Sequence, residues 1–329
     1  MTETFSTEIP AGQPALKVIG LKVYYHISQG IVKAVDDIDF TVGCGEFVGL
    51  SGESGCGKTT TAMTLLQILP KEGVVEGGQA IVGNTDILTL GKKDMEAFRW
   101  KGISMVFQGA MNSLNPVHRV IDQMVDAILI HEDMSKKEAR EIALELIESV
   151  GIEKSRARAY PHELSGGMKQ RLMIALSLVL HPPLVIADEP TTALDVMIQA
   201  QILDLFKQLR EKTSLSLLII THDLSVLAET CDRVIIMYAG KIVEEALVEI
   251  IFNEPAHPYT RKLIASFPSI LADKEIEFIP GNPPDLIDPP IGCNYHPRCD
   301  YAIDKCRTED PPLVDEGGHR VACFRRHEI

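Results

Sequence analysis

One stretch of the chain has the residue types and spacing of a loop that binds phosphate groups. Gly52-Glu53-Ser54-Gly55-Cys56-Gly57-Lys58-Thr59 fits the pattern G-x-x-x-x-G-K-[ST] at every fixed position. Glycines let backbone N–H groups curl around phosphate oxygens, Lys58 adds a positive charge, and the Thr59 hydroxyl can ligate Mg²⁺. We therefore predict a phosphate site here rather than a glycine-rich turn with a chance lysine. The expected contact residues are Gly52, Ser54, Gly55, Cys56, Gly57, Lys58, Thr59 and Thr60.

A pair of carboxylates follows the apolar run Leu184–Ala187. Asp188 ends this expected strand, where an acidic ligand to Mg²⁺ is needed beside a phosphate loop. Glu189 comes one residue later, in a position to polarise an attacking water as general base. The alternative is two ordinary surface acids after a core strand, which the following Pro190-Thr191-Thr192 makes less favourable.

The segments around these residues predict an α/β fold with a parallel sheet, because helical stretches separate short apolar runs. The runs are Glu46–Leu50, Ser104–Phe107, Leu184–Ala187, Leu217–Ile220 and Val234–Met237. Alternating apolar and polar residues from about Lys17 to Val42 predict antiparallel strands at the start of the chain. A helix is expected from Gly57 to Leu69, ended by Pro70.

Residues 109–163 carry helical spacing without strands, so we expect an all-helical insertion there. Ile121, Met124 and Val125 fall on one helical face. A second helix should open with the capping box Ser135-x-x-Glu138 and close at Gly151.

Composition narrows the functional class. The chain has 329 residues, with 45% hydrophobic and 24% charged, which predicts one large domain and a smaller one. No apolar run approaches the roughly 20 residues of a membrane helix, and the first residues lack a signal peptide, so we expect a cytoplasmic chain. The net charge of −14 argues against a broad nucleic-acid surface. Any membrane role should therefore come through a partner.

The C-terminal part, from about residue 251 to 329, has a different texture, with clustered prolines that predict a stiff linker and a separate module. Four of the seven cysteines lie there, at Cys293, Cys299, Cys306 and Cys323. Four thiolates could hold a [4Fe–4S] cluster or zinc, although no pair has C-x₂-C spacing. Four reduced cysteines without metal are the remaining alternative. We expect a structural role for any metal, since the module has little apolar content.

Further motifs carry a resemblance to a known family. Leu164-Ser165-Gly166-Gly167-Met168, with Gln108, Ala193-Leu194-Asp195 and His222, makes residues 16–250 similar to the ATP-binding subunits of ABC transporters. The order of the motifs also matches. The implied fold is a P-loop NTPase head of the ABC type, with an N-terminal antiparallel β subdomain, the helical insertion and the small cysteine-rich C-terminal module.

The resemblance implies roles for individual residues. Gln108 would sense Mg²⁺ and the attacking water. Ser165, Gly166 and Gly167 would open a helix that binds the γ-phosphate of ATP held by an opposite subunit. Asp195 would join the two sites, and His222 would contact the γ-phosphate, although a lone histidine is more often structural. Tyr25 is the candidate for stacking on adenine, with Tyr24 as its possible replacement and a core aromatic as the plainer reading.

Local features resemble the oligopeptide and dipeptide importer branch. They include Gly52-Glu53-Ser54-Gly55, Met168, His257-Pro258-Tyr259-Thr260, His296-Pro297-Arg298-Cys299 and the last cysteine segment. The resemblance implies a second, different ATPase subunit, two permease subunits and an extracytoplasmic binding protein, with this chain on the cytoplasmic face of the membrane. It also implies an iron–sulfur cluster in the tail. The branch moves nickel and oligosaccharides too, so peptide is the preferred cargo among three.

Two other classes use the same ATPase head. DNA-repair and chromosome ATPases interrupt it with coiled coils or zinc-bearing insertions, whereas the insertion expected here is short and lacks heptads. Ribosome-associated factors usually carry two heads in one chain, and this chain has one. Cys56, where serine is common in the resembling family, should make nucleotide binding sensitive to thiol reagents.

Overall fold

The computed structural model describes residues 9–109, 113–192, 194–266 and 279–329. The chain forms two compact units, which are described separately. The helical unit comprises Met1–Leu16, Val42–Glu46 and Ile81–Ile219. The phosphate-loop unit comprises Lys17–Thr41, Phe47–Ala80 and Ile220–Ile329.

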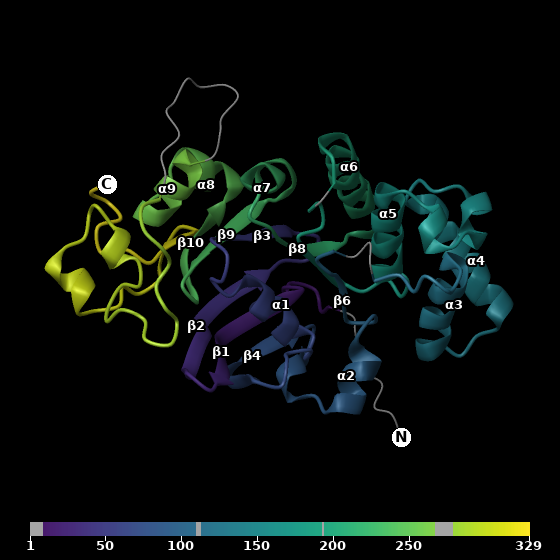
Figure 1. Cartoon of the computed structure of the whole chain (residues 1–329), viewed down its shortest axis with the longest axis horizontal. Helices are drawn as coiled ribbons and strands as arrows, with labels where there is room; N and C mark the ends of the chain where they lie inside the picture. Colours follow the sequence, from purple (N-terminus) through teal and green to yellow (C-terminus); the bar gives the residue numbers. More distant parts are fainter. Residues whose placement is uncertain (1–8, 110–112, 193, 267–278) are drawn as a thin grey trace. The chain divides into compact units, whose positions relative to one another are not determined.

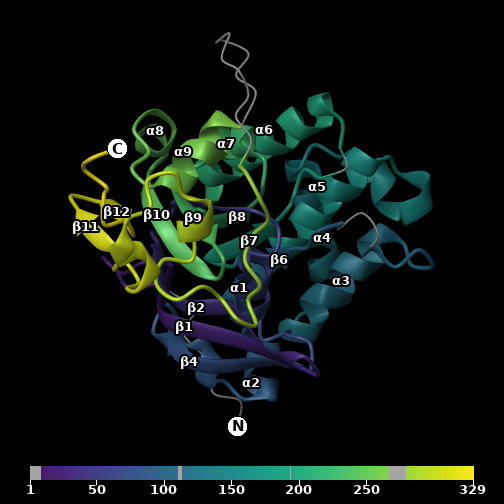
Figure 2. The same ribbon diagram turned by 60° about the vertical axis from the view of Figure 1, so that its left-hand side comes forward.

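The phosphate-loop unit contains the predicted N-terminal strands. These are β1 (Leu16–Ile27) and β2 (Gly30–Val42), joined by only two residues, as in an antiparallel hairpin. Their inward side chains, Val23 and Val35 among them, have no exposed surface. The strand β4 (Gly73–Val82) adds to β1, giving the order β2-β1-β4. Figures 1 and 2 show α1 (Lys58–Leu65) beside these strands.

A second sheet in this unit carries the phosphate loop. Its order is β11-β12-β10-β9-β3. The strands are β3 (Phe47–Ser51), β9 (Arg233–Tyr238), β10 (Lys241–Leu247), β11 (Val314–Glu316) and β12 (His319–Val321). β3 runs parallel to β9 and is buried along its whole length, whereas β10 is antiparallel to β9. The helices are α1, α7 (Leu224–Thr230), α8 (Val248–Asn253) and α9 (Pro258–Ala265).

The described C-terminal residues add two strands to this sheet. β12 pairs with β10, with Val321 opposite Glu244, and covers an edge whose backbone groups would otherwise lack partners (Figure 2). The proline-rich segment lies along β2, where Lys33 N–H donates to the carbonyl of Leu286 at 3.0 Å. Two 3₁₀ turns, His296–Arg298 and Asp304–Arg307, complete the described part of this segment.

The helical unit contains the strand order β8-β7-β6. The strands are β6 (Ile103–Val106), β7 (Leu184–Asp188) and β8 (Ser216–Ile220), and β8 ends in the phosphate-loop unit. β6 and β7 are parallel, as the sequence predicted. The α-helices are α2 (Lys92–Phe98), α3 (Val120–His131), α4 (Lys136–Ser149), α5 (Gly166–Ser177) and α6 (Val196–Thr213). Short pieces are β5 (Thr85–Asp86) and the 3₁₀ turns Ile87–Thr89, Lys154–Arg158 and Pro161–Glu163.

Helices α3 and α4 lie in the stretch where the sequence predicts helices without strands, and they pack with α5 (Figures 1 and 2). The predicted capping box is present. Ser135 N–H donates to Oε2 of Glu138 at 2.8 Å, and Glu138 N–H donates to Oγ of Ser135 at 3.3 Å. α4 then ends beside Gly151, which has a φ of 75°.

The helix α1 ends earlier than its sequence pattern predicts, at Leu65 instead of Leu69. Gln67 takes a φ of 49°, and its N–H bonds to the carbonyl of Thr64. Ile68 N–H bonds to the carbonyl of Met63, which completes a Schellman closure. Pro70 therefore follows a helix that has already stopped.

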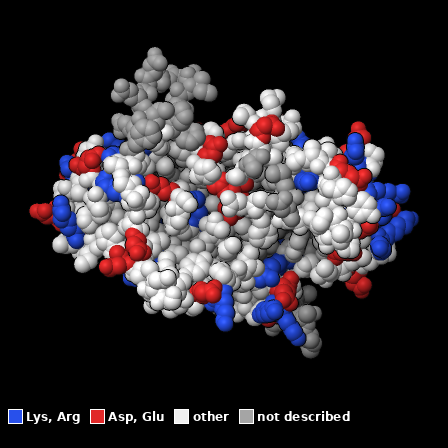
Figure 3. Space-filling view, in the orientation of Figure 1, with Lys and Arg blue, Asp and Glu red and all other residues white. Residues whose placement is uncertain are grey.

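The surface of the described residues mixes both signs of charge. Figure 3 shows acidic and basic side chains interspersed over the face that it draws. Within the described ranges, no helix is both long and apolar enough to cross a bilayer.

Candidate nucleotide site

The predicted phosphate loop connects β3 to α1 and is held so tightly that two of its glycines cannot be replaced without movement. Gly52 has a φ of 147°, and a Cβ there would lie 2.1 Å from the carbonyl oxygen of Met237. Gly57 has a φ of 109°, and its Cβ would lie 2.3 Å from the carbonyl oxygen of Ala34. Both obstacles are backbone atoms, which cannot swing aside as a side chain can.

Lys58 is buried inside the loop that it is predicted to serve. Its ammonium donates to the carbonyl oxygens of Gly52 at 2.6 Å and Glu53 at 3.0 Å. The same ammonium lies 3.6 Å from the sulfur of Cys56, whose pKa is raised by burial although Lys58 opposes that rise. The positive charge of Lys58 therefore already lies where phosphate oxygens are expected. The ammonium can donate to a bound phosphate in place of these two carbonyl oxygens.

Tyr25 rather than Tyr24 faces the helix that follows the loop. The Tyr25 hydroxyl lies 3.2 Å from Oγ1 of Thr60, a half-buried residue of α1. Tyr24 instead donates to Oδ1 of Asp36 at 2.6 Å, and burial followed by this hydrogen bond raises its pKa. Successive strand residues point to opposite faces, which explains the difference. Thr59, the predicted Mg²⁺ ligand, is exposed at the start of α1.

His222 follows β8 in the phosphate-loop unit. Its neighbour Thr221 donates its N–H to the carbonyl of Leu50 at 3.3 Å, in the strand that leads into the phosphate loop. On its other side, Asp223 caps α7 by accepting the N–H of Ser225 at 2.9 Å. The exposed histidine is thus held between two fixed residues.

In the helical unit, Gln108 and the two carboxylates lie at one edge of the parallel strands. Val106 of β6 is opposite Ala187 of β7. Gln108 comes two residues after the first and is exposed, while Asp188 comes directly after the second and is buried. Because the carboxyl ends of parallel strands meet at one edge, these residues lie at the same edge of the sheet.

Glu189 adopts a backbone conformation that few residues other than glycine take, with a φ of 50°. Such conformations cost roughly 1–3 kcal/mol and are found most often at functional sites. Its carboxylate accepts the hydroxyl of Thr192 at 2.7 Å, and the N–H of Thr192 donates to its carbonyl at 3.2 Å. The turn and Thr192 therefore hold the Glu189 carboxylate in one orientation, and this contact of Thr192 was not predicted.

The segment from Leu164 to Met168 opens α5, as the family resemblance implies. Ser165 is the N-cap, and its hydroxyl accepts the N–H of Met168 at 3.3 Å. Gly166 is exposed in the first turn, so nothing on that residue blocks the helix N-terminus. Gly167 is buried, and a Cβ there would lie 2.8 Å from Cγ2 of Ile198. The N–H groups of a helix start favour an anion.

Two further contacts in this unit were not predicted. Gln170 of α5 donates from Nε2 to the carbonyl of Pro190 at 2.6 Å, which ties that helix to the residue after Glu189. Asp195 is exposed and caps α6 by accepting the N–H of Ile198 at 2.9 Å. A glutamine inside a helical pattern gives no sequence signal for such a contact. Ala193, which belongs to the same predicted motif as Asp195, lies outside the described residues.

The predicted residues are divided between the two units. The phosphate-loop unit holds the loop, Thr59, Tyr25 and His222. The helical unit holds Gln108, Asp188, Glu189, Ser165, Gly166, Gly167 and Asp195. Their individual roles toward ATP and Mg²⁺ stay predictions.

Three of the four C-terminal cysteines have a raised pKa. Burial, with the other thiols adding to it, raises the pKa of Cys293 to about 12 and that of Cys299 to about 11. Burial also raises the pKa of Cys323, and Cys293 N–H donates to the carbonyl of Cys306 at 2.9 Å. These directions all favour neutral thiols.

The four-cysteine metal site is nevertheless not supported as a ready ligand set. Among the described residues, no group of three or more histidine, cysteine or acidic side chains is arranged to hold a metal ion. Metal binding would have to remove protons from buried thiols, and neutral thiols have no charge that draws a cation to them. The cluster or zinc therefore stays a prediction, and the four cysteines are free thiols in this structure.

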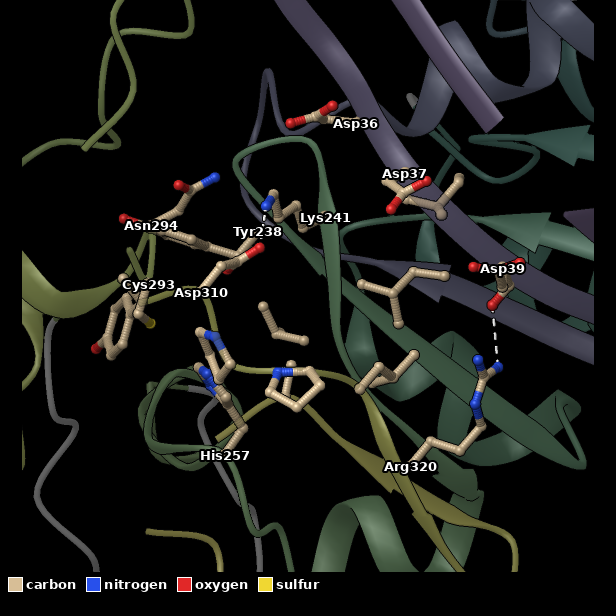
Figure 4. Close-up of a pocket in the computed structure, with 18 residues that line it drawn as sticks. Asp36, Asp37, Asp39, Tyr238, Lys241, His257, Cys293, Asn294, Asp310 and Arg320 are labelled. Carbon is tan, nitrogen blue, oxygen red and sulfur yellow. Dashed lines mark hydrogen bonds and ion pairs between the residues drawn. The ribbon is translucent and has the colours of Figure 1, made fainter. Parts of the chain in front are cut away.

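A cavity of about 320 Å³ lies where the C-terminal residues face β2 and β10 (Figure 4). Lys241 of β10 pairs with Asp310, and Arg320 donates to the carbonyl of Asp39 at 3.0 Å. His257, at the lower side of the view, is fully buried, and burial lowers its pKa to about 4. One ion pair and one hydrogen bond from a guanidinium therefore line this cavity, together with a neutral histidine.

Comparison with known proteins agrees with this geometry. Residues 35–192 match the ABC transporter family, and residues 243–306 match the C-terminal region of oligopeptide/dipeptide transporters. A probable peptide ABC transporter ATP-binding protein of Sinorhizobium fredii is 44% identical, with 97% of each chain covered. The oligopeptide transport ATP-binding protein OppD of Salmonella typhimurium is 42% identical, also with 97% of each chain covered.

A solved structure resembles the chain as well. The ATP-binding cassette MJ0796, a dimer in a post-hydrolysis state with ADP and phosphate, superimposes with a TM-score of 0.63. It is 28% identical and covers 71% of this chain and 98% of its own. The chain therefore belongs to the ATP-hydrolysing family of ABC transporter ATP-binding subunits, in the branch that carries the oligopeptide/dipeptide transporter C-terminal region.

Proposed function

We propose that this chain binds and hydrolyses ATP to drive the uptake of dipeptides or oligopeptides across the cytoplasmic membrane. The observation that carries the proposal is the phosphate loop. Gly52 and Gly57 hold its backbone close to neighbouring carbonyl oxygens, and the buried ammonium of Lys58 lies inside it. Membership of the peptide-transporter branch supports the choice of cargo.

The hydrolytic roles follow from the chemistry of the placed residues. Lys58 and the first N–H groups of α1 would bind the β- and γ-phosphates, and Tyr25 would stack on adenine. Mg²⁺, when bound, would neutralise the charge that develops on the phosphates, and Thr59, Gln108 and Asp188 are its proposed ligands. The water oxygen would bond to the γ-phosphorus while the bond to the ADP oxygen breaks.

Glu189 is the proposed acceptor of the water proton, and its strained turn keeps the carboxylate oriented. His222 would contact the γ-phosphate and help to position the water. Gln108 would report the occupancy of the site to the helical residues 109–163. These three are the side chains that we assign to the reacting groups.

A second ATPase subunit, a different chain, is proposed because α5 begins at the exposed Gly166, and a helix N-terminus suits an anion on another molecule. Ser165, Gly166 and Gly167 would bind the γ-phosphate of the nucleotide held by that partner, and Asp195 would link the two sites. ATP would favour the closed pair and ADP the open one, and this difference in affinity can do work. Two permease subunits would receive that work, and an extracytoplasmic protein would supply the peptide.

The proposed place of the chain is the cytoplasmic side of the membrane, attached through the permeases. Its proposed division is an ATPase domain over residues 16–250 and a C-terminal module over 251–329. The family matches at 35–192 and 243–306 support two parts. Nickel or oligosaccharide uptake is the second candidate cargo, and a role outside transport, in DNA repair or at the ribosome, is a distant one.

A metal in the C-terminal module is a further proposal. The hydrogen bond of 2.9 Å from the Cys293 N–H to the carbonyl of Cys306 supports it, because it brings two of the four cysteines together. A [4Fe–4S] cluster is preferred to zinc on ligand type, and it would stabilise the module. Iron, sulfide and zinc content of protein purified without oxygen tests this, with Cys299→Ser/Cys306→Ser as the control that should lose the metal.

Transport measurements with Glu189→Gln test the main proposal. In transporters assembled in vesicles, this variant should still bind ATP, but its rate of ATP hydrolysis should fall at least about a hundredfold. The rate of labelled peptide uptake should fall by a similar factor. Glu141→Gln changes an exposed acid of α4 and should leave both rates unchanged. Peptide uptake at the normal rate in Glu189→Gln would contradict the proposal, and uptake of nickel but not peptide would favour the second cargo.

A further inference from the structure

An arginine from the cysteine-rich segment forms a bidentate ion pair with a residue of the phosphate loop. Nη1 of Arg298 lies 2.6 Å from Oε2 of Glu53, and Nη2 lies 3.0 Å from Oε1. The two residues are 245 positions apart in sequence. This two-pronged geometry fixes both the position and the orientation of the carboxylate, which a lysine could not do.

The guanidinium is itself held from several sides. It is nearly buried, with 8% of the residue exposed. It donates to the carbonyls of Pro280 at 2.8 Å and Gly281 at 3.3 Å, and to the hydroxyl of Tyr238 at 3.2 Å. Its carbon lies 5.7 Å from the centre of the Tyr238 ring. Because so many of its donors are bound, this side chain has a fixed position, unlike a mobile surface charge.

A second residue of the same unit supports the loop at the same point. The hydroxyl of Tyr259, a ring without exposed surface, accepts the N–H of Glu53 at 2.9 Å. Its ring packs against Tyr238 at 4.7 Å and Tyr295 at 5.4 Å. Tyr259 thus binds the backbone of Glu53 and Arg298 binds its carboxylate, and both residues follow β10 in the chain.

The turn between β9 and β10 provides a further connection. Asn294 donates from Nδ2 to the carbonyl of Ala239 at 3.0 Å, and Gly240 N–H donates to the carbonyl of Cys56 at 3.0 Å. Two routes therefore lead from the segment between Cys293 and Cys299 to the loop, one through Arg298 and one through this turn.

The charge of Glu53 makes the first route important for binding. Glu53 lies within a loop that must receive a strongly anionic triphosphate, and an uncompensated carboxylate there would repel it. Arg298 cancels that charge locally. It also fixes Glu53, whose carbonyl oxygen is one of the two that hold the Lys58 ammonium.

We propose that Arg298 is a positioning residue for ATP binding, which holds the phosphate loop open in its binding shape and cancels the charge of Glu53. This inference rests on the proposed ATP-binding function. It makes the cysteine-rich segment a determinant of nucleotide affinity and not only a stabilising appendage. Arg298 does not touch the reacting atoms, so its effect is on binding rather than on the chemical step.

Nucleotide affinity in the assembled transporter tests the proposal. Arg298→Gln should raise the Kd for a fluorescent ATP analogue and the KM for ATP about tenfold, with kcat changed by less than about twofold. In Glu53→Gln/Arg298→Gln no carboxylate is left unpaired, so its Kd should lie below that of Arg298→Gln. Arg326→Gln is the matched control, because Arg326 also binds a carboxylate, that of Glu316, in the same C-terminal segment.

The possible results separate clearly. An unchanged Kd in Arg298→Gln, or a loss of thermal stability with an unchanged Kd, would overturn the proposal, as would an equal rise of Kd in Arg326→Gln. Should Arg298→Gln fail to fold, Tyr259→Phe carries the test, and a rise of Kd of about threefold or more supports the proposal while no rise overturns it. Failure of the unaltered transporter to bind ATP would instead overturn the proposed function.

Discussion

Nε2 of His319 lies 2.7 Å from Oε1 of Glu244, a carboxylate of β10 that has no exposed surface. The same carboxylate accepts the N–H groups of Ala256 at 2.7 Å and His257 at 3.0 Å. One buried side chain therefore joins the C-terminal hairpin to β10 and to the start of α9. Such a group is costly to bury and is tolerated because its oxygens are all bound.

Replacing this carboxylate should loosen the C-terminal residues. Glu244→Gln keeps the shape of the side chain but puts an amide N–H₂ where an acceptor is needed, so the free energy of unfolding should fall by about 3 kcal/mol. Denaturant unfolding followed by circular dichroism measures the loss. The control Glu316→Gln alters an exposed acid of the same hairpin and should leave the free energy of unfolding nearly unchanged. Equal losses in the two variants would show that the buried contacts of Glu244 contribute nothing special.

The same carboxylate predicts a pH dependence with a definite sign. Burial works against the charge of Glu244, but hydrogen bonds from His319 and from the Ala256 and His257 N–H groups outweigh it and lower the pKa below 4.5. A lowered pKa in the folded state gives stability that is present above pH 4.5 and is lost as the pH falls further. The melting temperature of the unaltered chain should therefore fall more steeply than that of Glu244→Gln below that pH. Parallel curves would contradict the assignment.

The local features of the fold were predictable from sequence because short-range patterns specify them. The alternation in β1 and β2, the buried run of β7 and the capping box at Ser135 each depend on a few neighbouring residues. The phosphate loop was predictable for the same reason, and propensity and spacing carry the information in these cases. The start of α5 was expected only from the family resemblance.

Other features could not be predicted because they depend on contacts between distant segments. No local pattern tells that β12 would complete the edge of β10, or that Arg298 would reach Glu53. The end of α1 at Leu65 was missed because Gln67, without the glycine that normally marks such a closure, takes a positive φ. The cysteine spacing indicated a cluster of thiols, but spacing alone does not determine where sulfur atoms point.

Two glycines of the phosphate loop should respond differently to the same substitution. Gly52→Ala would place a methyl group 2.1 Å from the Met237 carbonyl oxygen, so the loop must shift and ATP affinity should fall at least about a hundredfold. At Gly55 nothing lies within 4 Å of the new Cβ, and only the φ of 81° opposes it. Gly55→Ala should therefore cost about 1–2 kcal/mol of stability and weaken ATP binding much less. Kd measurements for both variants decide, and equal Kd values would contradict the steric argument.

The aromatic ring beside α1 should contribute to nucleotide affinity without selecting the base. Tyr25→Ala should weaken ATP binding by about 1–3 kcal/mol, and GTP binding by a similar amount, because stacking uses the face that every base offers. Tyr24→Phe removes only a hydroxyl that bonds to Asp36 and should leave both affinities unchanged. Titration with fluorescent ATP and GTP analogues measures the effect. A loss in Tyr24→Phe equal to that in Tyr25→Ala would show that the wrong tyrosine was assigned.

Cys56 should react with thiol reagents slowly, despite its place in the phosphate loop. Only 4% of the residue is exposed, and burial raises the pKa of its thiol, so the reactive thiolate is scarce. Cys44 is exposed and serves as an internal control within the same chain. Brief treatment with iodoacetamide, followed by peptide mass spectrometry, should find Cys44 modified well before Cys56, and unfolding should remove the difference. Because Cys56 lies against the Lys58 ammonium, ATP binding should be lost at the same slow rate at which Cys56 is modified. Loss of ATP binding at the faster rate of Cys44 modification would contradict the burial of Cys56.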